Sequence, residues 1–285
     1  MYSILSPALN LQAFRELFGI FRTRGGLIYE LTRREISDRY AGQVFGLFWT
    51  IGHPLMVTLI YIFIFGFVFR ARMGGTLDMP LDYTSYLLAG IIPWLMFQEV
   101  MGKSSMVIVS NANVVKQVIF PIEVLPIKIV LASLVTESVF LLLMSAYSLI
   151  ISHGILWTYT FLPVLVFFQT IALIGVSYLF SSVGVYFRDL KDFVQVFLSV
   201  AVFIMPVLYL PESIPSVIRP ILYLNPLSYI VWCYQDALYF GSFLHPWAWV
   251  IFIGGSVFIF IYGYRVFSRL KVMFEIGRAS CRERV

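Results

Sequence analysis

The chain has 285 residues, of which 60% are hydrophobic, 18% are aromatic and only 12% are charged. Soluble globular proteins are roughly half apolar and a quarter charged, so this composition excludes an ordinary water-soluble fold. The formal net charge of +5 is modest, and we expect membrane lipids around the chain and no nucleic acid. Several windows reach the roughly 20 apolar residues that a helix needs to cross a bilayer. The sequence therefore predicts an integral membrane protein.

The first 47 residues are too short and too poor in apolar positions for a domain, and their pattern predicts two helices. The first helix has one apolar face, which is typical of a helix lying in the membrane interface. That face contains Leu11, Phe14, Leu17, Phe18 and Phe21. We expect Gly25 and Gly26 to break this helix.

A second helix, expected on the cytoplasmic side, follows the two glycines and precedes the first span. Its charges are spaced for i,i+4 pairs, such as Glu30 with Arg34 and Glu35 with Arg39. This spacing is typical of a water-exposed face. The helix is either a solvated collar of the membrane domain or a gate.

Six apolar runs then follow, each of a length that suits a membrane span. We place them roughly at residues 48–69, 84–102, 126–151, 160–186, 193–210 and 247–267. Runs such as LIYIFIFGFVF are apolar at every position, whereas strands of a membrane β-barrel alternate with a period of two. We therefore predict an all-α fold with a six-helix transmembrane domain over 48–267 and a cytoplasmic tail over 268–285. The last nine residues, 277–285, are abruptly basic, and we expect them to be non-native.

The positions of lysine and arginine predict the orientation of the helices. If the N-terminus is cytoplasmic, 17 of the chain's 20 lysines and arginines lie on that side. Cytoplasmic loops collect such residues, so we expect both termini to be cytoplasmic.

Three connections between the spans have distinct patterns. An amphipathic helix is predicted over 105–116, before a break at Pro121 and Pro126. The charged stretch FRDLKD at 187–192 is expected to be a tight cytoplasmic turn. Between the fifth and sixth spans, YLNPLSYIVWCYQDALYFG is too polar to span and too aromatic for an open loop, so we expect two short re-entrant helices in the outer leaflet.

The chain carries few groups suited to chemistry. It has no G-x-x-x-x-G-K-[ST] phosphate loop, and its three histidines have no second metal ligand at a suitable spacing. We expect no enzymatic activity, no metal site and no cofactor in this chain. Glu137 lies near the middle of the third span, where a charge costs at least about 2.5 kcal/mol. It either forms a structural hydrogen bond with Ser or Tyr of another helix or serves a proton-coupled carrier.

Five stretches in order carry a resemblance to a known family. They are RREISDRYAGQVFGLFWTIGHPLMVTLIYIFIFGFVF, AGIIPWLMFQE, NVVKQVIFPIEVLP, VYFRDLKDF and LNPLSYIVWCYQDALYFG. Together they resemble the membrane permeases of type-2 ABC exporters for O-antigen, capsule, teichoic acid and related polysaccharides, over roughly residues 10–275.

The resemblance implies a channel-forming subunit of an ATP-driven exporter that moves lipid-linked polysaccharide across the bacterial inner membrane. Two copies then form a homodimer, and two separate ABC ATPase subunits bind ATP and Mg. The loops that contact these ATPases are implied to contain Asn111, Asn113, Lys116, Gln117, Arg188, Asp189, Lys191 and Asp192.

Further roles follow from the same resemblance, which assigns the channel wall to the first and fifth spans. Tyr61 with Phe65 and Phe193 with Phe197 form i,i+4 aromatic pairs that could stack on sugar rings, with packing or lipid contact as the alternative. The resemblance also implies a substrate with phosphate on its lipid end at the cytoplasmic leaflet. Guanidinium groups can bind such a headgroup through two parallel hydrogen bonds. The candidates for this contact are Arg33, Arg34 and Arg39, which otherwise only set orientation.

Two other functions stay open on the residues alone. A proton-coupled secondary transporter needs no ATPase and could use Glu137. A membrane-embedded glycosyltransferase or acyltransferase needs a catalytic acid, base or histidine near an interface, and no paired carboxylates indicate one.

Overall fold

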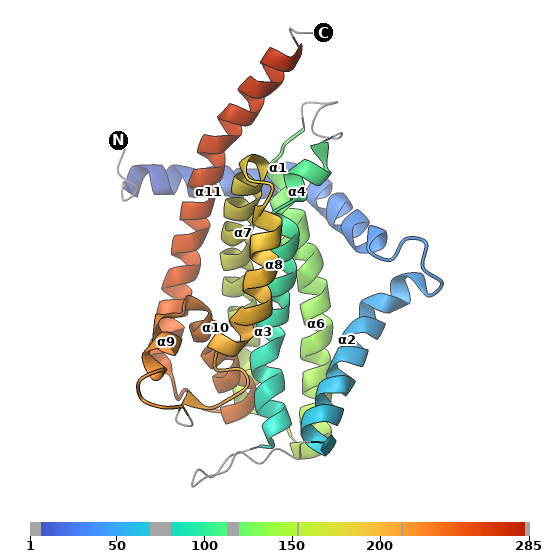
Figure 1. Ribbon diagram of the computed structural model, residues 1–285, viewed down its shortest axis with the longest axis vertical. Coiled ribbons are helices and arrows are strands. Elements are labelled where there is room, and N and C mark those ends of the chain that lie inside the picture. Colours follow the sequence, from blue (N-terminus) through green and yellow to red (C-terminus); the bar gives the residue numbers. More distant parts are fainter. Residues whose placement is uncertain (1–6, 69–80, 113–119, 153, 212–213, 283–285) are drawn as a thin grey trace.

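The computed structural model describes residues 7–68, 81–112, 120–152, 154–211 and 214–282, with side chains between residues 19 and 271 except residue 152. Every regular element within these ranges is a helix (Figure 1), which confirms the all-α prediction. Helix α1 runs across one end of the helical bundle, and α9 and α10 lie at the other end. We call these the α1 end and the α10 end.

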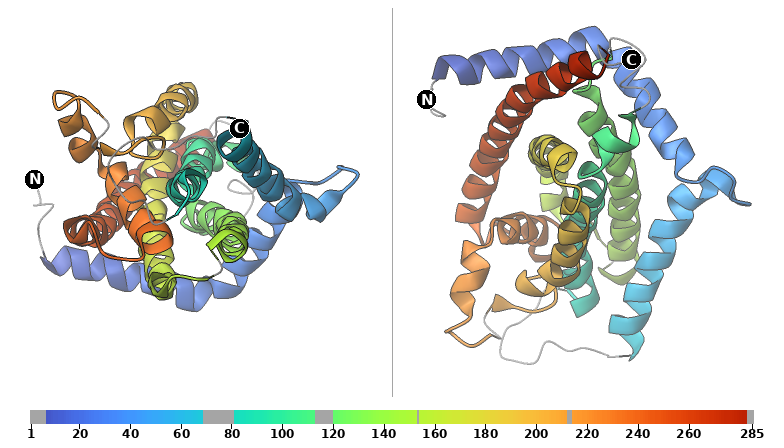
Figure 2. Two further views of the ribbon diagram at one scale, coloured as in Figure 1. Left: turned by 90° about the horizontal axis from the view of Figure 1, so that it is seen from below. Right: turned by 45° about the horizontal axis from the view of Figure 1, so that its top comes forward.

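Helix α1, Pro7–Asp38, is continuous, so the expected break at Gly25 and Gly26 is wrong. Each glycine costs a helix only about 1 kcal/mol, and a Cβ atom at either position would meet nothing within 4 Å. Ile28, three residues on, is only 3% exposed and anchors the helix against the bundle. One helix therefore covers the segment where we expected separate interface and gate helices, and Figure 2 shows that it changes direction partway along.

Six helical segments lie where the six spans are expected. In chain order they are α2 (Trp49–Tyr61) with the π-helix η2 (Ile62–Val68), α3 (Tyr83–Ser104), α6 (Val124–Ser152), η3 (Trp157–Phe161) with α7 (Leu162–Tyr186), α8 (Leu190–Ala201) with η4 (Val202–Ile204), and α11 (Pro246–Arg282). Within the described residues, four stretches are long and apolar enough to cross a membrane. They are Gly46–Val68, Val124–Ile151, Trp157–Tyr186 and Pro246–Lys271.

The other two segments differ from these four for separate reasons. Helix α3 lies inside the bundle, where Leu87 and Val100 are fully buried, so it needs less apolar surface than a helix that faces lipid. Helix α8 has 12 residues, and at 1.5 Å per residue it covers only part of the roughly 30 Å hydrocarbon layer.

Short helices fill the connections. Of the helix expected over 105–116, the structure describes α4, Val107–Ser110, whereas residues 113–119 lie outside the described part. Two consecutive helices, α9 (Arg219–Leu224) and α10 (Pro226–Gln235), precede α11, and α10 continues into the π-helix η6 (Asp236–Phe240). Two helices therefore precede the last segment, whereas their re-entrant position in the outer leaflet stays a prediction.

Helices α7 and α11 cross at very close range. A Cβ atom added to Gly175 would lie 2.4 Å from the Ile259 carbonyl oxygen, and one added to Gly263 would lie 2.1 Å from the Gly175 oxygen. Only glycine allows this approach, and small residues at such crossings are typical of helix packing in membranes. The two helices therefore pack backbone against backbone on this side of the bundle.

Candidate functional site

The α1 end brings together the segments for which the sequence predicts a role in coupling. Helix α4 and the turn between α7 and α8 both lie at this end of the bundle (Figure 1). A Cβ atom on Gly184 would lie 1.8 Å from the Ser105 carbonyl oxygen, so the end of α7 touches the backbone just before α4. The two expected contact loops are therefore neighbours in space.

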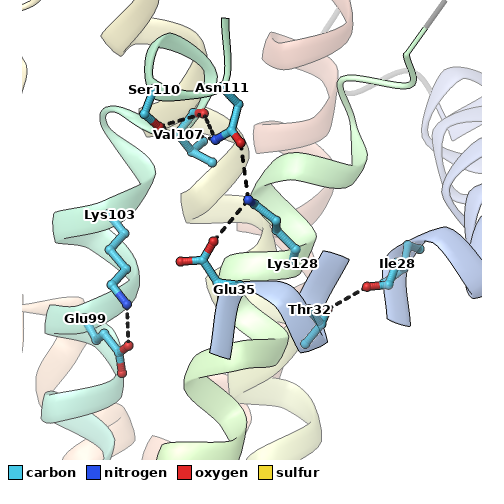
Figure 3. A network of polar contacts seen from close by, with 9 residues as sticks. All are labelled: Ile28, Thr32, Glu35, Glu99, Lys103, Val107, Ser110, Asn111 and Lys128. Atoms are coloured by element: carbon cyan, nitrogen blue, oxygen red, sulfur yellow. Dashed lines mark hydrogen bonds and ion pairs between the residues drawn. The ribbon is translucent and has the colours of Figure 1, made fainter. Parts of the chain in front are cut away.

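Lys128 is the centre of a polar network at this end (Figure 3). Its side chain is only 9% exposed, and its Nζ lies 3.0 Å from Oε2 of Glu35 in α1. The same Nζ lies 3.5 Å from Oδ1 of Asn111, directly after α4. Asn111 in turn donates from Nδ2 to the Val107 carbonyl at 2.8 Å. One lysine of α6 thus contacts both α1 and the end of α4.

A second cluster surrounds Glu99 of α3. Its carboxylate forms ion pairs with Arg39 and, at 2.9 Å, with Lys103. Arg39 also donates from Nη1 to Oγ1 of Thr136 at 3.3 Å, whereas its Nε and Nη2 are buried and have no hydrogen-bond partner among the described residues. Burial raises the pKa of the neighbouring Tyr40 hydroxyl above its usual value, despite an opposing effect of Arg39. Tyr40 is therefore neutral and is no counter-ion for Arg39.

The expected pairing along α1 is right in one case and wrong in another. Arg34 and Glu30 form an exposed i,i+4 pair at 3.2 Å. Glu35 and Arg39 instead bind Lys128 and Glu99 on other helices. Sequence spacing alone cannot tell a face that meets water from one that meets another helix.

The remaining sequence-predicted contact residues lie on the α7–α8 turn. Arg188, Asp189, Lys191 and Asp192 are all exposed. Backbone hydrogen bonds close the turn, with the Phe193 amide donating to the Asp189 carbonyl at 3.1 Å. Asn113, Lys116 and Gln117 lie outside the described residues.

The two aromatic pairs expected to line a channel have different surroundings. Tyr61 and Phe65 are stacked with ring centres 6.1 Å apart, and Phe65 packs on Tyr83 of α3 at 5.8 Å. Phe193 and Phe197 are 71% and 39% exposed on the surface of α8. Within one copy the first pair is partly buried against the core, whereas the second faces outward.

Of the three arginines predicted to bind a headgroup, Arg33 and Arg34 are exposed on α1, and Arg39 is largely enclosed. No ion pair or hydrogen bond of the Arg33 side chain is found within the part of the chain that the structure describes. Among the three, Arg33 is therefore the exposed arginine without a partner in the described part of the chain.

Glu137 of α6 is 2% exposed and forms a hydrogen bond to another helix, the first of the two alternatives that the sequence leaves open. Its Oε1 lies 3.1 Å from the hydroxyl of Tyr234 in α10, which also contacts Oε1 of Gln169 in α7. The amide nitrogen of Gln169 points to the Pro93 carbonyl, and this fixes the orientation of the amide.

Counting hydrogens in this group indicates the state of the carboxyl. The Tyr234 hydroxyl has one hydrogen and cannot donate to two oxygens. Both contacts are satisfied when it donates to Gln169 and a protonated Glu137 donates to it. The second oxygen of Glu137 is buried without a partner among the described residues, which costs a neutral acid less than a carboxylate. The geometry suits a neutral, structural Glu137.

A buried aspartate with three polar contacts at the α10 end was missed by sequence reasoning. Asp236 is fully buried and accepts hydrogen bonds from the His245 amide at 3.0 Å and from Nε1 of Trp249 at 3.1 Å. It also lies 2.9 Å from Nδ1 of His245. Gly241, with a φ of +65°, turns the chain between these residues. The signal was an aspartate within an aromatic stretch, but the partners could not be named from sequence.

Comparison with known proteins shows which family of membrane proteins the chain belongs to. The model of the ABC-2 type transporter family matches residues 26–239. The chain belongs to this family. It is also 29% identical to an O-antigen export system permease protein, RfbA, of Klebsiella pneumoniae over 87% of the chain and 93% of that protein. It is 28% identical to RfbA of Myxococcus xanthus over 75% of the chain and 80% of that protein. It is 24% identical to the polysialic acid transport protein KpsM of Escherichia coli over 76% of the chain and 83% of that protein.

Proposed function

We propose that the chain is the transmembrane, channel-forming subunit of an ATP-driven exporter of lipid-linked polysaccharide, either O-antigen or capsular polysaccharide. The proposal depends on one observation, the similarity to O-antigen export permeases over 87% of the chain. A separate ABC ATPase subunit, with ATP and Mg bound to it, supplies the energy. The sequence itself contains no phosphate loop that could do so.

A homodimer is part of this proposal, and exposed apolar surface supports it. On α8, Phe193 and Val196 are 71% and 66% exposed, and in the first span Ile51 of α2 and Phe63 of η2 are 57% and 61% exposed. Such faces suit acyl chains, a second copy or a passage for substrate. Six spans in each copy, with α8 completed by the segment that follows it, give two copies a shared channel between their first and fifth spans.

We assign the α1 end to the cytoplasm of a bacterium, with the protein in the inner membrane. The charge distribution supports this orientation, since 17 of 20 lysines and arginines then face the cytoplasm. A cysteine at Ser110 should be protected from an impermeant reagent in spheroplasts, and one at the 87% exposed Val217 should react. The reverse pattern would refute the orientation.

The exposed turn between α7 and α8, together with the segment that begins at Asn111, is proposed to contact the ATPase. Arg33 on α1, which is exposed and has no partner among the described residues, is proposed to meet the phosphate of the substrate's lipid end. The planar guanidinium group of Arg33 suits phosphate oxygens. Arg34 already pairs with Glu30, and Arg39 pairs with Glu99.

The decisive experiment is transport by the purified permease and its ATPase in lipid vesicles. We expect movement of lipid-linked polysaccharide to require ATP and both proteins. The double variant D189K/D192K should lower ATP-driven transport while the permease still inserts, because both charges are exposed on the turn. Transport driven by a proton gradient without the ATPase would refute the proposal in favour of a secondary transporter. Turnover of an activated sugar by the permease alone would favour a transferase instead.

A further inference from the structure

Lys128 is bound by partners from two distant parts of the chain. A lysine side chain that is 9% exposed requires compensating groups. Its partners are Glu35 on α1 and Asn111 beside α4, which the sequence separates by more than 70 residues. Among the contacts drawn in Figure 3, only Lys128 of α6 contacts both Glu35 and Asn111. The lysine is therefore placed between the segment proposed to contact the ATPase and the helix that crosses the α1 end.

The partner beside α4 moves with that helix. Asn111 is tied to α4 through its donation to the Val107 carbonyl at 2.8 Å, so its Oδ1 has a set direction toward Lys128. This contact is 3.5 Å long, at the limit of a hydrogen bond, whereas the ion pair with Glu35 measures 3.0 Å. A small shift of α4 changes the longer contact first.

Away from Lys128, the segment that leads into α4 is held by close backbone contact. The backbone before α4 touches α7 at Ser105 and Gly184, where there is no room even for a methyl group. Packed backbone of this kind does not deform gradually. On the side that faces Lys128, the polar contact between Lys128 and Asn111 is made by two side chains, and such contacts can change partners.

The partner on α1 belongs to a firmly seated turn. Thr32, one turn before Glu35, donates to the Ile28 carbonyl at 2.8 Å, and Ile28 is 3% exposed in the core. A force on Glu35 therefore acts on this part of α1 as a unit. The same helix carries Arg33, which is proposed to meet the substrate headgroup.

We propose that Lys128 is a positioning residue that transmits displacement of α4 to helix α1 through Glu35. The inference rests on the proposed function, since the ATPase is what moves α4. The Lys128 ammonium group contacts both Asn111 and Glu35. When Asn111 moves, the ion pair between Lys128 and Glu35 changes, and with it the position of α1. Lys128 contacts neither nucleotide nor polysaccharide in this role.

The test compares Lys128→Met with a matched control, Lys103→Met, in the reconstituted complex of permease and ATPase. Methionine keeps an unbranched side chain but removes the charge. Lys103 pairs with Glu99 four residues earlier in the same helix. Removing the Lys103 charge therefore breaks no contact between different helices. We expect Lys128→Met to assemble with the ATPase and hydrolyse ATP, and to lose about fivefold or more of ATP-driven export, a typical lower limit for coupling between sites. Lys103→Met should export like the wild type.

A second readout separates transmission from a merely structural role. Amide hydrogen exchange of residues 28–38 should depend on ATP in the wild-type complex and in Lys103→Met, and lose that dependence in Lys128→Met. If Lys128→Met does not fold, the exchanged pair Lys128→Glu with Glu35→Lys should restore assembly and part of the export, because the ion pair is re-formed with opposite polarity.

The outcomes distinguish this inference from the function on which it rests. A wild-type complex without ATP-driven export refutes the proposed function and the inference with it. Wild-type export with an unchanged Lys128→Met, or with equal losses in Lys128→Met and Lys103→Met, refutes the inference alone. If the wild type exports but amide exchange of residues 28–38 does not depend on ATP, the inference is also refuted. The same holds if the double variant Lys128→Glu with Glu35→Lys assembles but does not export.

Discussion

The two ends of the bundle are held together by different interactions. At the α1 end, ion pairs join different elements: Glu35 with Lys128, Arg39 with Glu99, and Glu123 with Lys271. At the α10 end, neutral side chains donate to backbone carbonyls: Tyr83 to Leu208, Tyr86 to Pro206, Gln235 to Pro206, and Tyr239 to Leu81. Most of these groups are partly or fully shielded from water.

The backbone explains this difference. Around residues 205–211 the chain is irregular, so its carbonyls lack the partners that a helix provides. In a membrane such groups must be satisfied by the protein, and tyrosine and glutamine do this without burying a charge. At the α1 end the ion pairs are 9% to 28% exposed and can still exchange with water. The hydrogen bonds of the α10 end thus favour one arrangement, whereas the ion pairs of the α1 end can rearrange, as the proposed coupling to an ATPase requires.

The largest effect is expected from breaking the α10 end at Asp236. Asp236→Ala leaves the His245 amide and ring and the Trp249 indole without their acceptor, at about 1–3 kcal/mol for each buried donor. We expect a steep loss of folded protein in membranes and a lower thermal midpoint in detergent. Asp236→Asn keeps one acceptor oxygen and should lose less. Equal stability of the alanine variant and the wild type would contradict the fixed character of this end.

A smaller effect is expected at Glu137, which joins α6 to α10 and α7. Glu137→Leu leaves the Tyr234 hydroxyl short of a partner, which we expect to lower the unfolding free energy by about 1–3 kcal/mol. Glu137→Gln retains a donor and an acceptor of similar size, so thermal stability and ATP-driven transport should stay near wild type. Loss of transport by a stable Gln variant would instead indicate a group that must titrate, as in a proton-coupled carrier.

At the α1 end, Glu99→Gln should have a milder and salt-dependent effect. Its carboxylate pairs with Arg39 and Lys103 at 23% exposure, and partly exposed pairs contribute on the order of 1 kcal/mol. Raising salt should narrow the difference in thermal midpoint between variant and wild type, because screening weakens the pairs. Glu30→Gln, which removes an exposed pair with Arg34, is the matched control and should be neutral. A salt-independent loss at Glu99 would show that this end is as rigid as the other.

The smallest effect is expected for Arg33→Lys, which keeps the charge but loses the planar fork. We expect ATP hydrolysis stimulated by lipid-linked substrate to fall by roughly threefold, the scale of an exposed charged contact. Arg22→Lys, exposed on the same helix, is the control and should not change it. An unaffected Arg33→Lys, together with an unaffected Arg33→Gln of normal topology, would leave Arg33 as an orientation charge only.

Much of the architecture was predictable because it depends on local composition. Long apolar runs indicate membrane helices wherever they occur, and the prolines and aromatics after residue 210 indicated a pair of short helices that the structure contains. A hydrogen bond between Glu137 and a serine or tyrosine was one of two alternatives, since a carboxyl amid apolar residues must find a polar partner. The particular tyrosine, 97 residues away, was not predicted.

The sequence by itself determined that this chain is an all-α membrane protein, because the length and polarity of a run decide whether it can lie in lipid. Tertiary structure alone decided that α1 continues through Gly25 and Gly26, and that Glu35 binds Lys128 instead of Arg39. Helical spacing places two residues on one face, but it does not say which helix, if any, covers that face. Only the packing of α6 against α1 selects the partner, and a partly buried charge then takes the opposite charge that this packing brings nearest.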